Sequence, residues 1–226
     1  MSPRPVGASP LAERRMIENL AWLGHDSFRI GGSKTIYIDP WHLQPGSPAA
    51  DLILVTHNHR DHLSKDDIAL ISTPRTIIVG PAEVTDQVGG ETVTVRPGET
   101  VEVAGVTISA VPAYNTNKFR APGKLFHPRE DGKVGYIVEH DGRRIYHAGD
   151  TDAIPEMAAV TVDIALLPVS GTYAMTADEA AVAAATMRAG VVVPMHFGTI
   201  VGSLADAQRF AELSPAPVEI LVPFKD

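Results

Sequence analysis

The chain has 226 residues, and its 19 Lys and Arg against 27 Asp and Glu give a formal net charge of −8 at pH 7. Its hydrophobic content of 44% is sufficient for one large domain with a substantial core, which excludes wholesale disorder. The absence of Cys excludes disulfides, thiolate nucleophiles, iron–sulfur clusters and Cys-ligated zinc. Any metal would therefore be bound by carboxylates and by some of the nine His.

Composition also constrains location and partners. No apolar run of the roughly 18 residues that span a membrane is present, so we expect no membrane segment. No basic stripe is present, so we expect no nucleic-acid partner. Residues 1–15 lack the apolar core of a signal peptide, which favours a mobile tail on a cytoplasmic protein, with one domain over residues 16–226. A small anionic substrate remains compatible with the acidic charge if a metal attracts it.

Short extended segments dominate the first half of the chain. Apolar and β-branched residues between turn signals predict strands at 17–23, 27–30, 35–39, 52–56, 76–79, 92–95 and within 99–111. Residues 52–55 are apolar at every position, which is typical of a strand buried on both faces. Apolar residues at helical spacing predict a helix over 65–73, and Pro81 begins a second, shorter helix over 81–88.

The second half alternates strands with better-marked helices. The predicted strands are 134–140, 143–149, 163–169, 191–195 and 218–222. Thr176 and Glu179 form a capping box that begins a helix, and Gly190 is expected to end it. Ser203 caps a last helix over 203–213. This order predicts an α/β (α+β) fold in which two sheets face each other and helices cover their outer sides.

One short segment after the strand at 52–55 concentrates potential metal ligands, namely His57, His59, Asp61 and His62. Because alternate residues of a strand project to the same side, His57 and His59 can share one cation, and Asp61 and His62 can bind a second from the next turn. Imidazole and carboxylate ligands without thiolate suit zinc, manganese or iron(II). The alternative is a polar surface loop, but four such groups repel one another when protonated unless a metal organises them.

This His-x-His-x-Asp-His segment after a buried strand resembles the signature of the metallo-β-lactamase fold superfamily. The resemblance extends along nearly the whole chain from about Leu20. Segments 23–28, 147–152 and 168–176 resemble one branch in particular, which contains small metal-dependent hydrolases and the ascorbate-6-phosphate lactonases. The resemblance implies a four-layer αββα sandwich that binds one or two divalent ions, zinc before manganese or iron, at one edge between the sheets.

The resemblance also implies which residues bind the ions. Asp39, at an earlier strand end, resembles an acidic residue that supports a ligand, because a carboxylate that accepts an imidazole N–H fixes the ring. The alternative is that Asp39 only forms a turn before Pro40. The implied ligands of the first ion are His57, His59 and Asp150, and those of the second ion are Asp61, His62, His196 and Asp150.

One position departs from the superfamily pattern. A third His usually completes the first metal position at the end of a middle strand, and Asn115 stands there in this chain. An amide oxygen binds zinc more weakly than imidazole and suits a harder cation such as manganese. Two alternatives follow: either the first ion is weakly bound or absent, or His127 reaches the site from the following loop.

Other polar residues near these segments have two interpretations each. His25 follows a strand, and His147 lies three residues before Asp150; each is either a supporting residue near the metals or a hydrogen-bonded core His. The loop 115–133 is long enough for an active-site lid, and its basic residues either attract an anionic substrate or are simply solvated. These basic residues are Lys118, Arg120, Lys124 and Arg129.

Hydrolysis is the function that this pattern favours. A water bound by the metals would lose a proton near neutral pH and attack a small, anionic ester, lactone or phosphodiester, while Asp61 orients that water and accepts its proton. No covalent intermediate is needed, which agrees with the absence of Cys. The alternative, suggested by Asn115, is a non-catalytic metal-binding protein that acts as a sensor or scaffold.

Overall fold

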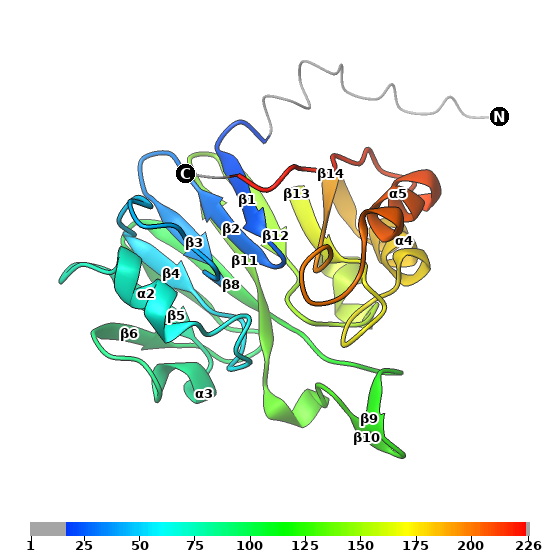
Figure 1. The fold of residues 1–226 in the computed structure, drawn as a ribbon, viewed down its shortest axis with the longest axis horizontal. Coiled ribbons are helices and arrows are strands. Elements are labelled where there is room, and N and C mark those ends of the chain that lie inside the picture. The colour runs from blue at the N-terminus through cyan, green and yellow to red at the C-terminus, as the bar shows by residue number, and fades with distance from the viewer. Residues whose placement is uncertain (1–16, 225–226) are drawn as a thin grey trace.

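Two six-stranded sheets pack face to face in the computed structural model, and helices lie on the outer side of each sheet (Figure 1). This arrangement confirms the four-layer αββα sandwich. The structure describes residues 17–224, so the tail predicted at 1–15 lies outside the described residues. Within the described range, no helix combines the length and apolar character needed to span a bilayer.

The first sheet follows chain order from β1 to β6. The first three strands pair antiparallel and the last four, from β3 onward, pair parallel. Parallel neighbours need crossover connections, and α2 (Lys65–Ile71) and α3 (Ala82–Thr85) lie in two of them. The strands are β1 (Leu20–Gly24), β2 (Ser27–Ile30), β3 (Ile36–Ile38), β4 (Leu52–Leu54), β5 (Ile77–Gly80) and β6 (Glu91–Thr94).

The second sheet has the order β14-β13-β12-β11-β8-β7. Its last three strands in the chain pair parallel, and the remaining pairs are antiparallel. Helix α4 (Ala177–Thr186) connects the last two strands, and α5 (Leu204–Leu213) follows them. The strands are β7 (Thr100–Val103), β8 (Val106–Pro112), β11 (Val134–His140), β12 (Arg143–His147), β13 (Thr161–Pro168) and β14 (Arg188–Met195).

A small hairpin projects from the sandwich between β8 and β11 (Figure 1). Its two strands, β9 (Phe119–Ala121) and β10 (Lys124–Leu125), pair only with each other. Two short 3₁₀ helices complete the described elements, η1 (Arg129–Asp131) after the hairpin and η2 (Pro155–Ala159) before β13. The sequence pattern did not predict the hairpin, because its strands are exposed and carry no apolar alternation.

Strands β3 and β4 in the middle of the first sheet are buried on both faces, which explains their continuous apolar runs. In β3, Ile36 and Ile38 pack into the core between the sheets, whereas Tyr37 packs on the other side with α2 and α3. In the same way, Leu52 and Leu54 of β4 face the central core and Ile53 faces the helices. Successive side chains of a strand point to opposite faces, so both faces of these strands must be apolar.

Two predictions about local structure are wrong. Helix α4 ends at Thr186, not at Gly190, because residues 188–195 pair with β13 and Gly190 lies inside β14. Residues 218–222 form no strand and make only one bridge, between Val218 and Val192. In both places the hydrogen bonds of the sheet, which the local sequence does not reveal, decide the outcome.

A close approach of backbones in the second sheet gives a test of this packing. A Cβ atom at Gly135 of β11 would lie 2.5 Å from the His147 carbonyl oxygen and 2.6 Å from that of Ala148. These backbone atoms are held by the sheet and cannot move away without a cost in free energy. We therefore expect Gly135→Ala to lower the free energy of unfolding by about 1–3 kcal/mol in urea denaturation. Gly89→Ala is the control, since no atom lies within 4 Å of its Cβ position. Equal stability of the two variants would contradict the packing.

Candidate metal centre

The candidate ligands lie where parallel strands of both sheets end. Asp39 follows β3, and the segment from His57 to His62 follows β4. Asp150 follows β12 and His196 follows β14 directly. The carboxyl ends of parallel strands meet at one edge of a sheet, so residues far apart in the sequence converge there.

A first group of ligands consists of His57, His59, His127 and Asp150, each with one ligand atom within 4.8 Å of the others. The His127 Nε2 atom lies 3.2 Å from His59 Nδ1 and 3.7 Å from Asp150 Oδ2. Three imidazoles and one carboxylate oxygen at these separations match the tetrahedral donor sets that bind zinc.

A second group consists of Asp26, His62, Asp150 and His196. The Asp150 Oδ1 atom lies 3.6 Å from His62 Nε2 and 3.2 Å from His196 Nε2. Asp150 therefore faces the first group with its Oδ2 atom and the second group with its Oδ1 atom, which is the geometry of a carboxylate between two cations.

Asp61 lies beside the second group and is the more exposed carboxylate, with 20% of its side chain accessible. Its Oδ2 atom lies 3.2 Å from His25 Nε2 and 3.7 Å from His62 Nε2. Burial alone would raise the pKa of Asp61, but the His25 hydrogen bond and the charge of His62 outweigh it and lower the pKa to about 2. Asp61 is therefore ionised at neutral pH.

Several buried atoms at the centre of these groups have no hydrogen-bond partner. Buried polar atoms in folded proteins almost always have one, so a convergent set of orphans indicates a missing cation. Nitrogen lone pairs and carboxylate oxygens are the donors that divalent transition metals require, and the residues present therefore fit such ions. The orphan atoms are Nε2 of His57, His62 and His196, Oδ1 of Asp150, and both carboxylate oxygens of Asp26.

Two rings of the cluster are oriented by Asp39 and Thr56. Asp39 Oδ2 accepts hydrogen bonds from His62 Nδ1 at 2.7 Å and from Thr56 Oγ1 at 2.7 Å. Since the single Thr56 hydroxyl proton goes to Asp39, the hydroxyl oxygen accepts from His57 Nδ1 at 3.0 Å. Both rings therefore donate from Nδ1 and face the site with Nε2, so hydrogen bonds fix their orientation before any ion arrives.

His196 and His147 have different partners. His196 Nδ1 contacts Ser170 Oγ at 2.7 Å, so its Nε2 atom also faces the cluster. His147 accepts a hydrogen bond from the Gly149 N–H on Nδ1 and therefore donates from Nε2 to the Asp26 carbonyl oxygen at 2.8 Å. His147 thus lies in neither ligand group and holds the backbone of a residue that does.

Asn115 supports His127 and belongs to neither group. The Asn115 side chain donates to the Tyr173 carbonyl at 2.7 Å and to Asp152 at 3.3 Å, and its Oδ1 atom accepts the His127 N–H at 3.0 Å. Of the two alternatives that the sequence left open, the structure has His127 beside the first metal position.

The basic residues of the loop 115–133 are partly neutralised by the protein itself. Lys118 Nζ lies 2.7 Å from a Glu179 carboxylate oxygen, and Arg129 lies 2.7 Å from Glu156. The other two predicted basic residues lie on the exposed strands β9 and β10. The start of the loop is also fixed, because Asp152 accepts the N–H groups of residues 116 and 117.

The two groups differ in charge. Burial lowers the pKa of His57 and His59, and it lowers that of His127 to about 4, so these rings are neutral near pH 7. In the second group burial also opposes charge, but Asp150 and Asp26 outweigh it and raise the pKa of His196 to about 9. The pKa of His62 is raised well above its usual value, mainly by Asp150 and Asp39. Without a bound cation, the protonated rings of His62 and His196 therefore balance the charge of the carboxylates in the second group.

Backbone strain accompanies the site. Seven described non-glycine residues have positive φ angles, and three of them lie at the site: His25, Asp39 and His196, at 52°, 47° and 60°. Such residues adopt this conformation rarely and at a cost, and the surrounding hydrogen bonds must maintain it. The strain aims three side chains into one small volume.

Sequence reasoning missed Asp26. It lies in the turn between β1 and β2, next to His25, and neither spacing nor chain order links it to the segment from His57 to His62. The available signal was an acidic residue beside a His at the end of a predicted strand, which is weak without the three-dimensional contacts.

Removing metal tests the fit of the cluster. Because the folded protein binds the ions and the unfolded chain does so weakly, each ion at 100 times its dissociation constant should add about 2.7 kcal/mol to the free energy of unfolding. We expect a chelator to lower the melting temperature measured by circular dichroism, and zinc or manganese to restore it. A melting temperature independent of chelator would contradict a metal centre.

The support of His62 by Asp39 gives a second test. Asn tolerates the positive φ of residue 39 but removes the negative charge from His62, so Asp39→Asn should weaken metal binding about 10–100-fold in calorimetric titration. Asp67→Asn is the control, because Asp67 accepts backbone N–H groups of residues 42 and 43 and contacts no ligand ring. Equal metal affinity in both variants would show that Asp39 does not orient a ligand.

Comparison with known proteins identifies the family of the chain. The profile of the "Beta-lactamase superfamily domain" matches residues 19–196. A UPF0173 metal-dependent hydrolase of Pyrococcus abyssi is 38% identical over 228 residues, covering 89% of this chain and 94% of its own length. Another, from Thermoplasma acidophilum, is 33% identical over 216 residues, covering 88% and 92%.

A solved structure is similar over the same range. The crystal structure of a Parabacteroides distasonis protein has 31% sequence identity and a TM-score of 0.77, and the alignment covers 89% of this chain and 91% of that one. The profile match, the curated relatives and this structure together establish the family of the chain. The chain belongs to the metallo-β-lactamase superfamily, among its metal-dependent hydrolases.

Proposed function

We propose that this hydrolase binds two divalent ions, zinc in first choice and manganese or iron(II) otherwise, and cleaves a small anionic ester, lactone or phosphodiester with an activated water. The observation that carries the proposal is the convergence of unpartnered buried nitrogen and oxygen atoms on two adjacent positions that share Asp150. When bound there, divalent ions supply a water with a pKa near roughly 7 and polarise the substrate oxygen.

The role of Asp61 is to hold the attacking water. Its carboxylate is the more exposed one of the cluster, and the hydrogen bond with His25 Nε2 fixes its orientation. With a pKa of about 2, Asp61 is ionised and accepts a hydrogen bond from the water at all ordinary pH values. The same low pKa makes it a weak base, so it orients the water more than it drives deprotonation.

No side chain of the centre is arranged as a covalent nucleophile. The chain lacks Cys, and Ser170 Oγ already donates to the Thr172 carbonyl and contacts His196 Nδ1. Direct attack by water is therefore the route that the residues support. Esters, lactones and phosphodiesters are all compatible with it, and Arg120 and Lys124 on the hairpin supply positive charge for an anionic substrate.

The non-catalytic sensor or scaffold loses the observation on which it rested. That alternative depended on Asn115 replacing a ligand, whereas His127 supplies the third imidazole beside the first position. His59 and Asp61 also retain access to solvent, which a purely structural metal centre does not need.

The proposal predicts the effect of removing His59. Because His59 is exposed, His59→Ala should keep the fold and melting behaviour of the metal-free protein. It should lower kcat/KM by roughly 100-fold or more. Loss of a group that only hydrogen-bonds to a metal ligand already lowers metal affinity or activity 10–100-fold, and loss of the ligand itself should have a larger effect. The measurement is a screen of chromogenic phosphodiesters and lactones with zinc or manganese. His42→Asn is the control, since His42 is exposed and belongs to neither ligand group; full activity of His59→Ala would exclude this mechanism.

A further inference from the structure

Asp26 is a buried carboxylate to which no described group donates a hydrogen bond. Its exposed fraction is 0%, and neither of its carboxylate oxygens has a hydrogen-bond donor. A carboxylate left in this state is strongly unfavourable unless a cation or a proton compensates it. A cation bound beside Asp26 would provide this compensation.

The Asp26 carboxylate points at the second metal position. Its Oδ2 atom lies 3.7 Å from His62 Nε2 and 3.7 Å from His196 Nε2, and both of these nitrogens are also unpartnered. Ligands about 2.1 Å from one ion in a tetrahedron are about 3.4 Å apart. The three atoms therefore have nearly the spacing of atoms that share one cation.

An ion pair with His25 does not explain Asp26. His25 Nε2 lies 3.4 Å from Asp26 Oδ2, but it is nearer to Asp61 Oδ2, at 3.2 Å, and forms its hydrogen bond there. One ring N–H cannot serve both carboxylates well, and the Asp26 Oδ1 atom has no partner in either case.

The turn between β1 and β2 is built to hold this side chain in place. His147 donates to the Asp26 carbonyl at 2.8 Å, and the His25 carbonyl accepts from Trp22 Nε1 at 2.9 Å and from the His196 N–H at 3.0 Å. The positive φ of His25 adds a strained residue immediately before Asp26. Such fixation is expected of a preorganised ligand.

We propose that Asp26 is a direct ligand of the second ion and that it makes this position prefer a harder cation than the first. The inference rests on the two-ion centre of the proposed function. The first position has three imidazoles and one carboxylate oxygen, whereas the second has two imidazoles and the carboxylates of Asp26 and Asp150, with the Asp61 carboxylate beside it. Imidazole favours zinc, and carboxylate oxygens shift the balance toward manganese(II).

The experiment measures metal selectivity without substrate. Full-length protein is stripped with chelator, loaded with Mn²⁺ at both positions and titrated with Zn²⁺, while released Mn²⁺ is followed by its solution EPR signal. Because zinc exceeds manganese in affinity at any site of this kind, it should displace both ions. Release of Mn²⁺ from the two positions should occur in two phases, whose apparent dissociation constants for zinc differ at least tenfold. A single phase in the wild type would overturn the proposal without any variant.

Variants then assign the phases. Asp26→Asn keeps the shape and removes the charge, and it should reduce Mn²⁺ binding at the second position at least tenfold while one tight zinc remains. His127→Ala should weaken the first position instead. Asp26→Asn with two ions at wild-type affinity, or with equal weakening at both positions, would overturn the assignment of Asp26 as a ligand.

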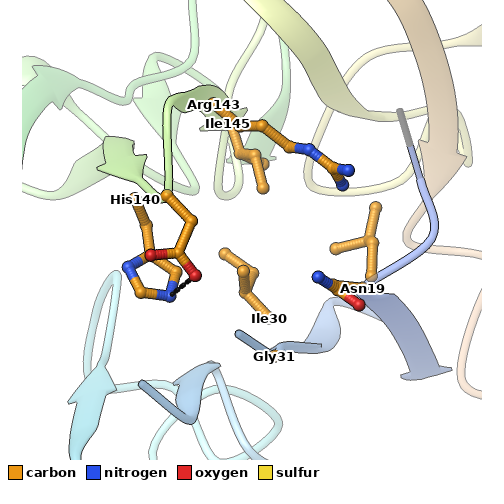
Figure 2. Close-up of a pocket in the computed structure, with 8 residues that line it drawn as sticks. Asn19, Ile30, Gly31, His140, Arg143 and Ile145 are labelled. Carbon is orange, nitrogen blue, oxygen red and sulfur yellow. Dashed lines mark ion pairs between the residues drawn. The ribbon is translucent and has the colours of Figure 1, made fainter. Parts of the chain in front are cut away.

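Asp141→Asn is the charge-matched control. Asp141 lies in the turn after β11, at the end of the sheet opposite the metal centre, in a pocket lined by Asn19, Gly31, His140 and Arg143 (Figure 2). It pairs with His140 at 3.3 Å and accepts from Ser33, so it should leave both metal phases unchanged. If the phases follow these expectations but no substrate is cleaved, the proposed function fails and the role of Asp26 stands.

Discussion

The structure depends on one carboxylate shared between two sets of imidazoles. Asp150 is buried, and its two oxygens face different histidine groups, so its charge is balanced from both sides at once. Burial would raise the pKa of Asp150, yet the neighbouring His196 and His62 hold it well below its usual value. Such a charge in an apolar interior is tolerated only with compensation, and every surrounding loop is positioned to provide it.

The sandwich makes this concentration of charge possible. Strands with both faces buried, such as β3 and β4, form a rigid apolar base. Their carboxyl ends lie at the edge of the sheet that carries the site. Hydrogen bonds from outside the cluster then orient several of its rings, with Asp39 behind His62 and Ser170 behind His196. The precision of the site thus derives from the sheets, although all its ligands lie outside strands.

The sequence pattern predicted those features that depend on neighbouring residues in the chain. The segment from His57 to His62 follows an apolar strand, so its spacing alone marked it as a candidate ligand cluster, and the capping box at Thr176 begins α4 where expected. The position of Asp26 in the second group, and that of His127 rather than Asn115 in the first, could not be predicted from the sequence. Each depends on which loops of distant strands meet, and no spacing within the chain encodes that meeting. The end of α4 failed for the same reason, since pairing with β13 overrides Gly190.

The loop 115–133 has two parts, an anchored base that supports His127 and an exposed hairpin. Residues 115–117 are tied to Asp152 and support His127, whereas β9 and β10 contact the rest of the protein little, and Phe119 is 53% exposed. Changes of sequence or length in the hairpin can therefore alter what approaches the centre without loosening the anchor at its base. The fold in this way allows the hairpin to change while the residues that support His127 keep their positions.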